Sequence, residues 1–362
     1  MKVLFVTTGT ASAAATRYRV SQYIPLLKSR GLDCDVFSII SGFTTKYMIK
    51  SPDMNGMNRL AYYALFLIER FMRSWLVIFR SPKYDRIFLQ RVTFPLRLEK
   101  LLHRLNPNII FDIDDAIYLP DTQHNDPLTK LKKFIKEGEV KAVLKISKCA
   151  IVENEYIKEY VSQFCGHIYK IPGPIDADRY FVKEKEDKKN IVVGWIGSPA
   201  TTCYLDILNN VFLKLLQKYS DLSIHLIGAG KYSLPGFKIK KIPWCYDTEV
   251  AELQKFDIGL MSMPDNEWTR GKLGCKMLQY MALGIPTVAS DTETNREIMT
   301  NGVNGFLAKG ENEWIDSISR LIESPELRRT LSLAGRRTIE EKCSLKKSVN
   351  SLLEVLSESC FS

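Results

Sequence analysis

The chain contains 362 residues, of which 45% are hydrophobic and 25% charged, and its formal net charge at pH 7 is +10. This length predicts two domains, because single domains usually contain about 100–200 residues. The eight cysteines are scattered without a C-x-x-C pair, and only four histidines are present. These counts exclude an evident metal-ligand cluster and favour a reducing, cytosolic setting.

The first half of the chain alternates short apolar runs with helical stretches. The run at 2–8 has too few consecutive apolar residues for a signal peptide, whose apolar core needs about 7–15, so it predicts a buried strand. A helix is predicted at 17–31, ended by Gly31. Further strands are predicted at 33–40, 84–91, 108–114, 149–154 and 168–173.

A basic and aromatic segment interrupts this alternation. Residues 59–104 contain ten Lys or Arg against three Asp or Glu, and residues 62–79 are apolar except for a few polar and charged positions. Glu69, Arg70 and Arg73 interrupt the apolar run too often for a membrane-spanning helix. The segment fits either a membrane surface or lipid-linked anion, or an internal helix with solvated arginines. Nucleic-acid binding is not indicated, because basic residues elsewhere are dispersed and no binding motif occurs.

The second half repeats the alternation of strands and helices. Strands are predicted at 190–197, 222–230, 257–264 and 286–290, helices at 204–219, 249–256 and 276–283, and a largely helical end from 311 to 356. Such alternation predicts parallel, doubly wound sheets. Residues 172–190 pass from prolines to a charged run and fit a linker. We therefore predict two Rossmann-like α/β domains, 1–180 and 181–340, and a C-terminal helix at 341–362 that packs back on the first domain.

The first candidate site follows the first predicted strand, since such sheets bind ligands beyond the carboxyl ends of their strands. Gly9 and the small residues after it allow a ligand to approach the backbone closely. Arg17 and Arg19 lie at the start of the next helix, and an arginine can bind phosphate through two hydrogen bonds. The alternative is an ordinary turn with surface arginines.

A second candidate site is the carboxylate cluster of Asp112, Asp114 and Asp115, at the end of a buried strand. Adjacent carboxylates repel one another, so the cluster needs a metal, a cation or sugar hydroxyls as partner. We select Asp114 as the functional carboxylate because it points opposite to its neighbours in an extended chain. Asp115 and Arg19 are assigned to an acceptor. The alternative is a loop that caps the following helix.

Two loops of the second domain are further candidates. Gly197, Ser198 and Thr201 follow the first strand of that domain and could present amides and hydroxyls to a diphosphate. A tight turn with a helix cap is the alternative interpretation. Thr292 and Asn295 add hydroxyl and amide groups after the strand at 286–290.

The strongest candidate is the stretch "RGKLGCKMLQYMALGIPTVAS". Gly274 near a helix N-terminus leaves backbone amides for phosphate. Lys272 and Lys276, four residues apart, are predicted to share one helix face, with Gln279 near it. A merely solvated lysine pair is the alternative.

The segment "GIPTVASDTETNREIMTNGVNGFLA" and the preceding "MLQYMALG" resemble the C-terminal core of family 4 glycosyltransferases, which are retaining enzymes of the GT-B fold. "IPGPIDADRYF" is similar to their I-P-N-G-V-D-x-x-x-F linker, and "RYRV" fits one branch. The resemblance implies two Rossmann-like domains facing a cleft, the second holding a nucleotide-sugar donor and the first an acceptor. It implies no catalytic metal and no cofactor other than a UDP- or GDP-linked donor.

The chain departs from this family at its E-x7-E motif, where Gly271 and Gln279 occupy the two glutamate positions. The resemblance implies that the second position bonds the ribose, which an amide can still do, and that the first bonds the donor sugar. Glu267, Asp265 or Arg270 are the predicted substitutes for the first glutamate. The usual diphosphate-binding Arg and Lys are replaced by "IGSPATT", so Lys272 and Lys276 are predicted in their place.

These assignments predict a glycosyltransferase of cell-surface polysaccharide or glycoconjugate synthesis. Arg17, Lys272 and Lys276 would stabilise the leaving diphosphate, and Asp114 would orient donor or acceptor hydroxyls. The acceptor is a glycan or a lipid-linked molecule, and the protein is cytoplasmic with peripheral contact at the inner membrane face. The alternatives are a non-catalytic nucleotide-sugar or glycan-binding relative and a GT-B-like nucleotide-sugar epimerase. A nicotinamide oxidoreductase is disfavoured, because the G-x-G at 228–230 lacks a third glycine.

Overall fold

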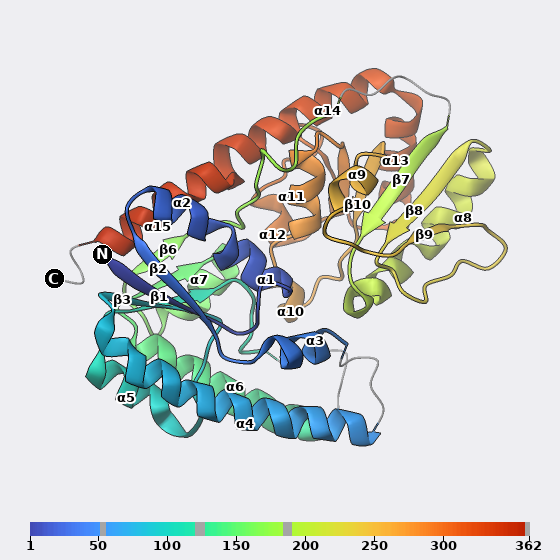
Figure 1. Ribbon diagram of the computed structural model, residues 1–362. Helices are drawn as coiled ribbons and strands as arrows, with labels where there is room; N and C mark the ends of the chain where they lie inside the picture. The colour runs from blue at the N-terminus through green and yellow to red at the C-terminus, as the bar shows by residue number, and fades with distance from the viewer. Residues whose placement is uncertain (51–55, 120–126, 184–189, 359–362) are drawn as a thin grey trace. The chain divides into compact units, whose positions relative to one another are not determined.

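The computed structural model describes residues 1–50, 56–119, 127–183 and 190–358. The chain forms two compact units (Figure 1). The first unit comprises residues 1–174, 271–273 and the chain from 345 on; the second comprises 175–270 and 274–344.

The first unit is built on a parallel sheet of six strands in the order β2-β1-β3-β4-β5-β6. The strands are β1 (Lys2–Thr7), β2 (Asp33–Ser38), β3 (Arg86–Gln90), β4 (Ile109–Ile113), β5 (Cys149–Val152) and β6 (Ile168–Lys170). The central strands β1, β3, β4 and β5 are mostly apolar and buried, which suits a sheet that is covered on both faces, whereas the edge strands β2 and β6 are partly exposed. Because all strands run in parallel, the residues that follow them meet at one edge of the sheet.

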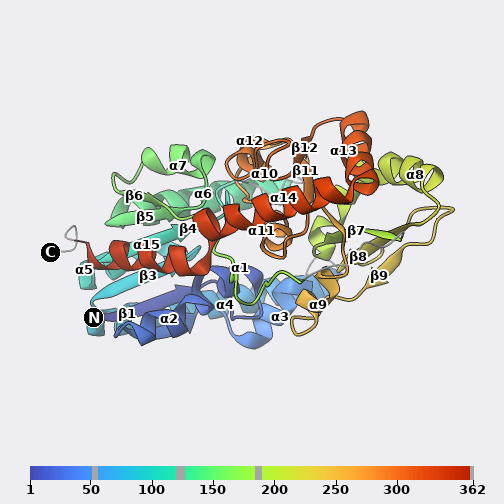
Figure 2. The same ribbon diagram turned by 90° about the horizontal axis from the view of Figure 1, so that it is seen from above.

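Helices cover both faces of this sheet. They are α1 (Ala14–Thr16), the π-helical turn η1 (Arg17–Ser21), α2 (Tyr23–Ser29), α3 (Gly42–Lys50), α4 (Gly56–Arg80), η3 (Ser81–Lys83), η4 (Pro95–Arg97), α5 (Leu98–Leu105), α6 (Pro127–Ile146), α7 (Glu155–Ser162) and α15 (Leu345–Ser357). Side chains of α4, α5, α6 and α7 pack in the core on one face, and those of η1, α2 and α15 pack on the other. Figure 2 shows α15 running along the first sheet. The single helix predicted at 17–31 is instead a π-helical turn followed by α2.

The second unit contains another parallel six-stranded sheet, in the order β12-β11-β10-β7-β8-β9. The strands are β7 (Ile191–Ile196), β8 (Leu222–Ile227), β9 (Lys240–Ile242), β10 (Ile258–Met261), β11 (Thr287–Ser290) and β12 (Phe306–Ala308). The helices are η5 (Pro199–Leu208), α8 (Asn209–Lys218), α9 (Glu249–Leu253), α10 (Glu267–Arg270), α11 (Cys275–Ala282), α12 (Glu293–Arg296), α13 (Glu311–Glu323), α14 (Pro325–Thr338) and η6 (Ile339–Cys343). The helix predicted at 204–219 begins as the 3₁₀ turn η5 and becomes α-helical only at Asn209.

The two sheets confirm the predicted two-domain α/β fold. Two short strands, β9 and β12, carry too little periodicity to have been recognised in the sequence. Within the described ranges, no helix has the length and apolar composition needed to cross a membrane.

Candidate functional site

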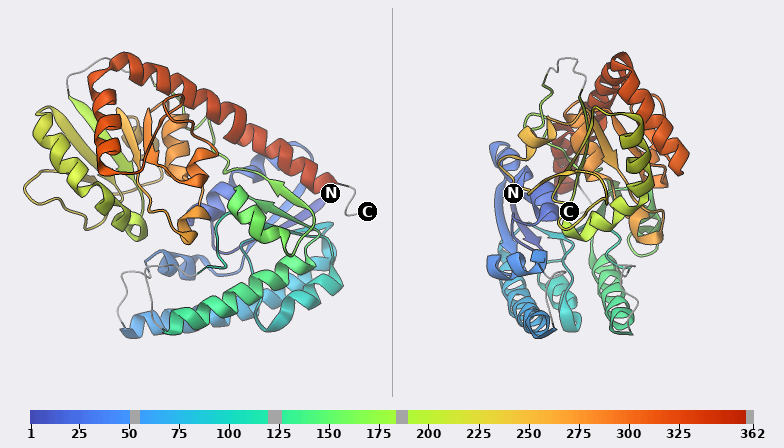
Figure 3. Two further views of the ribbon diagram at one scale, coloured as in Figure 1. Left: turned by 180° about the vertical axis from the view of Figure 1, so that it is seen from behind. Right: turned by 90° about the vertical axis from the view of Figure 1, so that its right-hand side faces the viewer.

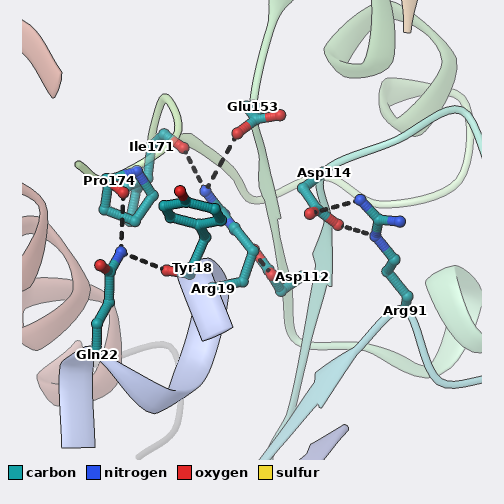
Figure 4. Close-up of polar contacts among 9 residues, drawn as sticks. All are labelled: Tyr18, Arg19, Gln22, Arg91, Asp112, Asp114, Glu153, Ile171 and Pro174. Carbon is teal, nitrogen blue, oxygen red and sulfur yellow. Dashed lines mark hydrogen bonds and ion pairs between the residues drawn. The ribbon is translucent and has the colours of Figure 1, made fainter. Parts of the chain in front are cut away.

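A buried charge cluster lies at the carboxyl edge of the first sheet (Figure 4). Arg19, from η1, donates from Nε to Asp112 Oδ2 at 3.1 Å and binds the same carboxylate through Nη2. Its Nη1 donates to the Ile171 carbonyl at 2.9 Å and lies 3.9 Å from Glu153 Oε1. The prediction that Arg19 binds an acceptor was therefore wrong: the side chain is 3% exposed, and these core groups occupy its guanidinium.

The partner of the adjacent carboxylates is Arg91, which directly follows β3. Its Nη2 donates to Asp114 Oδ2 at 2.6 Å, its Nε also binds Asp114, and its Nη1 lies 2.8 Å from Asp115 Oδ2. Asp114 does not point opposite to Asp115, because the chain leaves the extended conformation after β4 and both carboxylates reach Arg91. The described residues contain no group of three His, Cys, Asp or Glu suited to hold a metal ion.

Arg91 was missed in the sequence, although the carboxyl-edge argument that selected Asp114 applies to it. Its φ of 56° is in the left-handed region, which few residues other than glycine adopt. Such a conformation costs about 1–3 kcal/mol and is retained mainly at functional sites. The two-pronged contact with Asp114 thus holds Arg91 in a strained backbone at the carboxyl edge.

Burial and neighbouring charges shift the pKa values of the carboxyl groups in this cluster in different directions. Burial disfavours the charged form of Asp114, but Arg91 outweighs burial and lowers the pKa of that carboxyl. Burial raises the pKa of Asp112 in spite of its arginine partner. Burial also raises the pKa of Glu153 well above its ordinary value, and neighbouring carboxylates add to that effect. Asp114 is therefore an ionised hydrogen-bond acceptor, whereas Glu153 retains its proton to higher pH.

Hydroxyl groups on either side of the loop after β1 bind its backbone. Thr7 Oγ1 and Thr16 Oγ1 both donate to the Gly9 carbonyl, at 2.8 and 3.0 Å. Arg17 is only partly buried and its Nη1 lies 3.4 Å from the Ala11 carbonyl. Gly9 thus lies in this loop and Arg17 at the start of η1, from where its guanidinium reaches back to the loop, and their role in phosphate binding stays a prediction.

Gln90, the last residue of β3, adds an unsatisfied polar group to this edge. It pairs in register with Thr7 on one side and Asp112 on the other. The side chain is fully buried, and neither atom of its amide has a hydrogen-bond partner among the residues that the structure describes. Buried polar groups are normally paired, so the Gln90 amide can bind a water or a polar ligand at this edge.

In the second unit, the turn after β7 caps the following helix, and a lysine side chain contacts it. The Ser198 amide donates to Thr201 Oγ1 at 3.2 Å and the Thr201 amide donates to the Ser198 carbonyl at 2.9 Å, as the alternative interpretation required. Lys276 Nζ donates to Thr201 Oγ1 at 3.4 Å and lies 4.2 Å from the centroid of the Trp195 ring. A cation therefore stands at the Gly197–Ser198 turn.

Of the two lysines predicted at the start of α11, only Lys276 lies in the helix. The helix begins at Cys275 with Gly274 as its N-cap, so Lys272 lies before the helix. Residues 271–273 are also grouped with the first unit, whereas Lys276 belongs to the second. The prediction that Lys272 and Lys276 share one helix face was wrong, because the helix starts three residues after Lys272.

Three predicted donor-binding residues meet beside the start of α11. A Cβ placed on Gly274 would lie 3.1 Å from Asn295 Oδ1, so glycine permits this close approach. The Asn295 amide nitrogen of the backbone donates to Thr292 Oγ1 at 3.3 Å, and its Nδ2 donates to the Ser290 carbonyl at 2.8 Å. Asn295 Oδ1 itself is buried without a hydrogen-bond partner in the described part of the chain. This orphaned acceptor and the first amides of α11 offer contacts to a polar ligand.

Gln279 belongs to a buried polar network that the sequence did not reveal. Its Nε2 donates to Tyr180 Oη at 3.0 Å and to Glu249 Oε1 at 3.1 Å. Tyr180 and the indole N–H of Trp244 also donate to the Glu249 carboxylate. No spacing in the sequence connects these four residues, which come from α11, α9 and two loops.

The predicted sugar-binding substitutes lie on and beside α10. Glu267 is exposed at the start of that short helix. Arg270 donates from Nε to Asp265 Oδ1 at 2.9 Å and from Nη2 to Oδ2 at 3.3 Å, and both side chains are nearly half exposed. The structure brings Arg270 and Asp265 together as a surface pair and leaves their assignment to a donor a prediction.

Residues 190–324 match the family described as "Glycosyl transferases group 1". The chain is 26% identical over 231 residues to "Uncharacterized glycosyltransferase MJ1069" of Methanocaldococcus jannaschii; the match covers 60% of this chain and 53% of that protein. The chain thus matches its curated relatives over no more than about half of their length.

Solved structures share the architecture over the whole chain. HepE of Anabaena, crystallised with UDP and glucose, has a TM-score of 0.66 at 15% identity and covers 99% of this chain and 100% of its own. Sucrose-phosphate synthase of Thermosynechococcus elongatus has a TM-score of 0.70 at 12% identity, and the match covers 98% of both chains. At these identities the likeness shows the fold alone. The chain thus has the GT-B fold, and its residues 190–324 match a glycosyltransferase family.

Proposed function

We propose that this protein transfers a sugar from a nucleotide-diphosphate donor to a glycan or lipid-linked acceptor, with retention of anomeric configuration and without a catalytic metal. The observation that carries the proposal is the cation of Lys276, held at the turn after β7 inside the matched domain. A cation, a glycine-containing turn and a helix N-terminus at one sheet edge form a suitable environment for a diphosphate.

The second unit is the proposed donor site. Lys276, held at the turn of Gly197 and Ser198, and the first amides of α11 after Gly274 would bind the diphosphate, and the orphaned Asn295 Oδ1 would accept a hydrogen bond from the donor. Thr292 positions Asn295 through its hydroxyl. The UDP and glucose bound to HepE favour a UDP-linked donor over a GDP-linked one.

The transfer step follows from the charge that develops on the leaving diphosphate. The bond from the anomeric carbon to the phosphate oxygen breaks, and Lys276 of the second unit stabilises the negative charge on that oxygen, while the same role for Lys272 and Arg17 stays a prediction from the sequence. The acceptor hydroxyl attacks the face from which the diphosphate departs and gives its proton to the leaving phosphate. Asp114, kept ionised by Arg91, accepts hydrogen bonds from sugar hydroxyls and orients them.

The sugar and the acceptor need other residues. Gly271 has no side chain for the donor sugar, so Glu267 or Arg270 is proposed for that contact, while Gln279 bonds the ribose. Asp115 is proposed on the acceptor side. We place the reaction in the synthesis of cell-surface polysaccharide or glycoconjugate, at the cytoplasmic face of the membrane.

Substitution of Lys276 by alanine tests the donor site. Removal of a charge-assisted contact is worth about 1.5–3 kcal/mol, so donor affinity should fall roughly 10- to 100-fold. Isothermal titration with a panel of UDP- and GDP-sugars measures the change. Lys255→Ala, which removes an exposed lysine paired with Glu252, should leave affinity unchanged. Unchanged donor binding and turnover in Lys276→Ala would contradict the assignment.

A non-catalytic binding role is the second candidate, because glycine and glutamine occupy both glutamate positions of the motif. Such a protein would bind a nucleotide sugar but would neither hydrolyse nor transfer it with any acceptor of a glycan and lipid-linked panel. A nucleotide-sugar epimerase would instead convert the donor to a second nucleotide sugar without an acceptor, which chromatography of the products detects.

A further inference from the structure

Helix α4 of the first unit exposes an entirely apolar face. Between residues 61 and 79, each residue that is exposed is apolar: Ala61, Ala64, Leu67, Ile68, Phe71, Met72, Leu76 and Phe79. More than half of the surface of Leu67, Ile68, Met72 and Phe79 is exposed. A surface helix of a soluble domain normally shows the reverse arrangement, with its polar side chains outward.

The charged side chains of α4 between residues 61 and 79 are instead bound to the body of the first unit. Glu69 accepts the Ser41 amide at 2.9 Å. Arg70 binds Glu139 at 2.5 Å and Thr93 at 3.1 Å. Arg73 donates to the Ser38 carbonyl at 2.8 Å. Because these three side chains bind groups of the protein, their charges do not reduce the apolar character of the exposed face of the helix.

This exposed face is not needed to fill the core. Val77 and Ile78 of α4 are fully buried in the core of the first unit. The exposed side also has an aromatic row, in which the ring of Trp75 stacks on Phe79 at 5.6 Å and meets the edge of Phe71 at 6.5 Å. An apolar surface of this extent on one element indicates an interaction site.

The surface around α4 is basic. In the described part of residues 41–105, one exposed carboxylate, Asp85, stands against a larger set of exposed cations: Lys46, Arg80, Lys83, Arg97, Lys100 and Arg104. Figure 3 shows α4 and α6 along one face of the first sheet, and α5 contacts both. This charge is complementary to an anionic lipid surface, which attracts basic residues next to an embedded apolar helix.

We propose that the apolar face of α4 docks the first unit on an anionic bilayer, with the helix in the plane of the interface. The 19 residues from 61 to 79 extend about 28 Å along the helix axis, at 1.5 Å per residue. Their side chains enter the boundary between headgroups and acyl chains, while the surrounding lysines and arginines bind lipid phosphates. The inference rests on the proposed membrane location of the reaction and specifies the surface and the lipid charge.

Vesicle co-sedimentation of the full chain tests this surface. The wild type should bind phosphatidylcholine vesicles containing phosphatidylglycerol, bind plain phosphatidylcholine weakly, and lose affinity as salt rises. The double variant Ile68→Glu and Phe79→Glu should lose binding by at least about tenfold, because it places two charges on the embedded face. Both side chains are more than half exposed, so circular dichroism and thermal unfolding should stay as in the wild type. Leu333→Glu, at a site that is 70% exposed in the second unit, is the matched control and should bind as the wild type does.

Equal vesicle binding by the double variant and the wild type would overturn the proposal. The proposal would also fail if the wild type did not bind anionic vesicles but formed a dimer in light scattering that the double variant does not form. A second copy of the chain would then cover α4. An assay of sugar transfer to a water-soluble acceptor distinguishes failure of the α4 surface from failure of the proposed function. Vesicle binding without any transfer counts against the proposed function alone, and transfer without vesicle binding counts against the α4 surface alone.

Discussion

At the scale of single residues, two carboxyl groups of the same sheet edge have opposite acid–base behaviour. Asp114 and Glu153 are both buried. Arg91 binds Asp114 closely, so the pKa of Asp114 falls, whereas Arg19 lies 3.9 Å from Glu153 and does not overcome burial, so the pKa of Glu153 rises. Environments that separate the pKa values of neighbouring acids are typical of functional sites.

The raised pKa of Glu153 predicts a pH-dependent stability. The folded chain keeps this proton to higher pH than the unfolded chain does, so the free energy of unfolding falls as pH rises above about 4.3 and until the folded pKa is passed. Glu153→Gln removes that ionisation, and urea unfolding should show a shallower fall with pH, by up to about 1.4 kcal/mol per pH unit. Glu159→Gln, at an exposed site on α7, should retain the wild-type slope. An unaltered slope in Glu153→Gln would contradict the assignment.

At the scale of elements, the turn between β7 and η5 depends on the absence of a side chain. A Cβ on Gly197 would lie 2.1 Å from the Trp195 ring and 2.8 Å from Thr201 Oγ1. Trp195 is fully buried and has no room to move away. The turn can therefore hold Thr201 next to Lys276 only while residue 197 is glycine.

Gly197→Ala should consequently lower both stability and donor binding. Overpacking of this kind costs about 1–3 kcal/mol, and a shift of η5 would also displace Thr201 from Lys276. Thermal unfolding and titration with a nucleotide sugar measure the two effects. Gly138→Ala is the control: its Cβ would meet nothing within 4 Å in α6, and alanine favours a helix. Normal donor affinity in Gly197→Ala would show that the turn is not part of the donor site.

At the scale of the whole molecule, the chain returns to the first unit after completing the second. Helix α15 places Leu345, Val349, Leu352, Val355 and Leu356 in the core of the first sheet. The stability of the first unit therefore depends on residues more than 150 positions beyond its last strand, β6.

Leu352→Ala should destabilise the first unit specifically. Loss of a buried leucine costs about 2–5 kcal/mol. Amide hydrogen exchange should accelerate in peptides from β1 and β5 and stay unchanged in those from β7 and β10. Glu354→Ala, exposed on the same helix, should change neither set. Equal acceleration in both sheets would show that the two units unfold together.

Much of the fold could be predicted, because apolar periodicity is a local property. The strands at β1, β4, β7 and β10 each form a short buried run, and the intervening helices imply parallel sheets. The carboxyl-edge argument also located Asp114 and the Gly197 turn. It did not find Arg91 and Glu153, although both follow strands, since no local pattern distinguishes a residue that pairs with a distant carboxylate.

The sequence alone determined the alternation of strands and helices, the division into two α/β domains and the positions where glycine is needed, because burial periodicity and steric limits act over a few residues. Only the tertiary structure decided that Arg19 is a core ion pair, that Lys272 lies outside α11, and that α4 turns Arg70 and Arg73 inward and exposes an apolar face. Whether a charged or apolar side chain is buried depends on groups that are distant in the chain. The local sequence is therefore compatible with both a buried and an exposed side chain, and the assembled sheets decide between them.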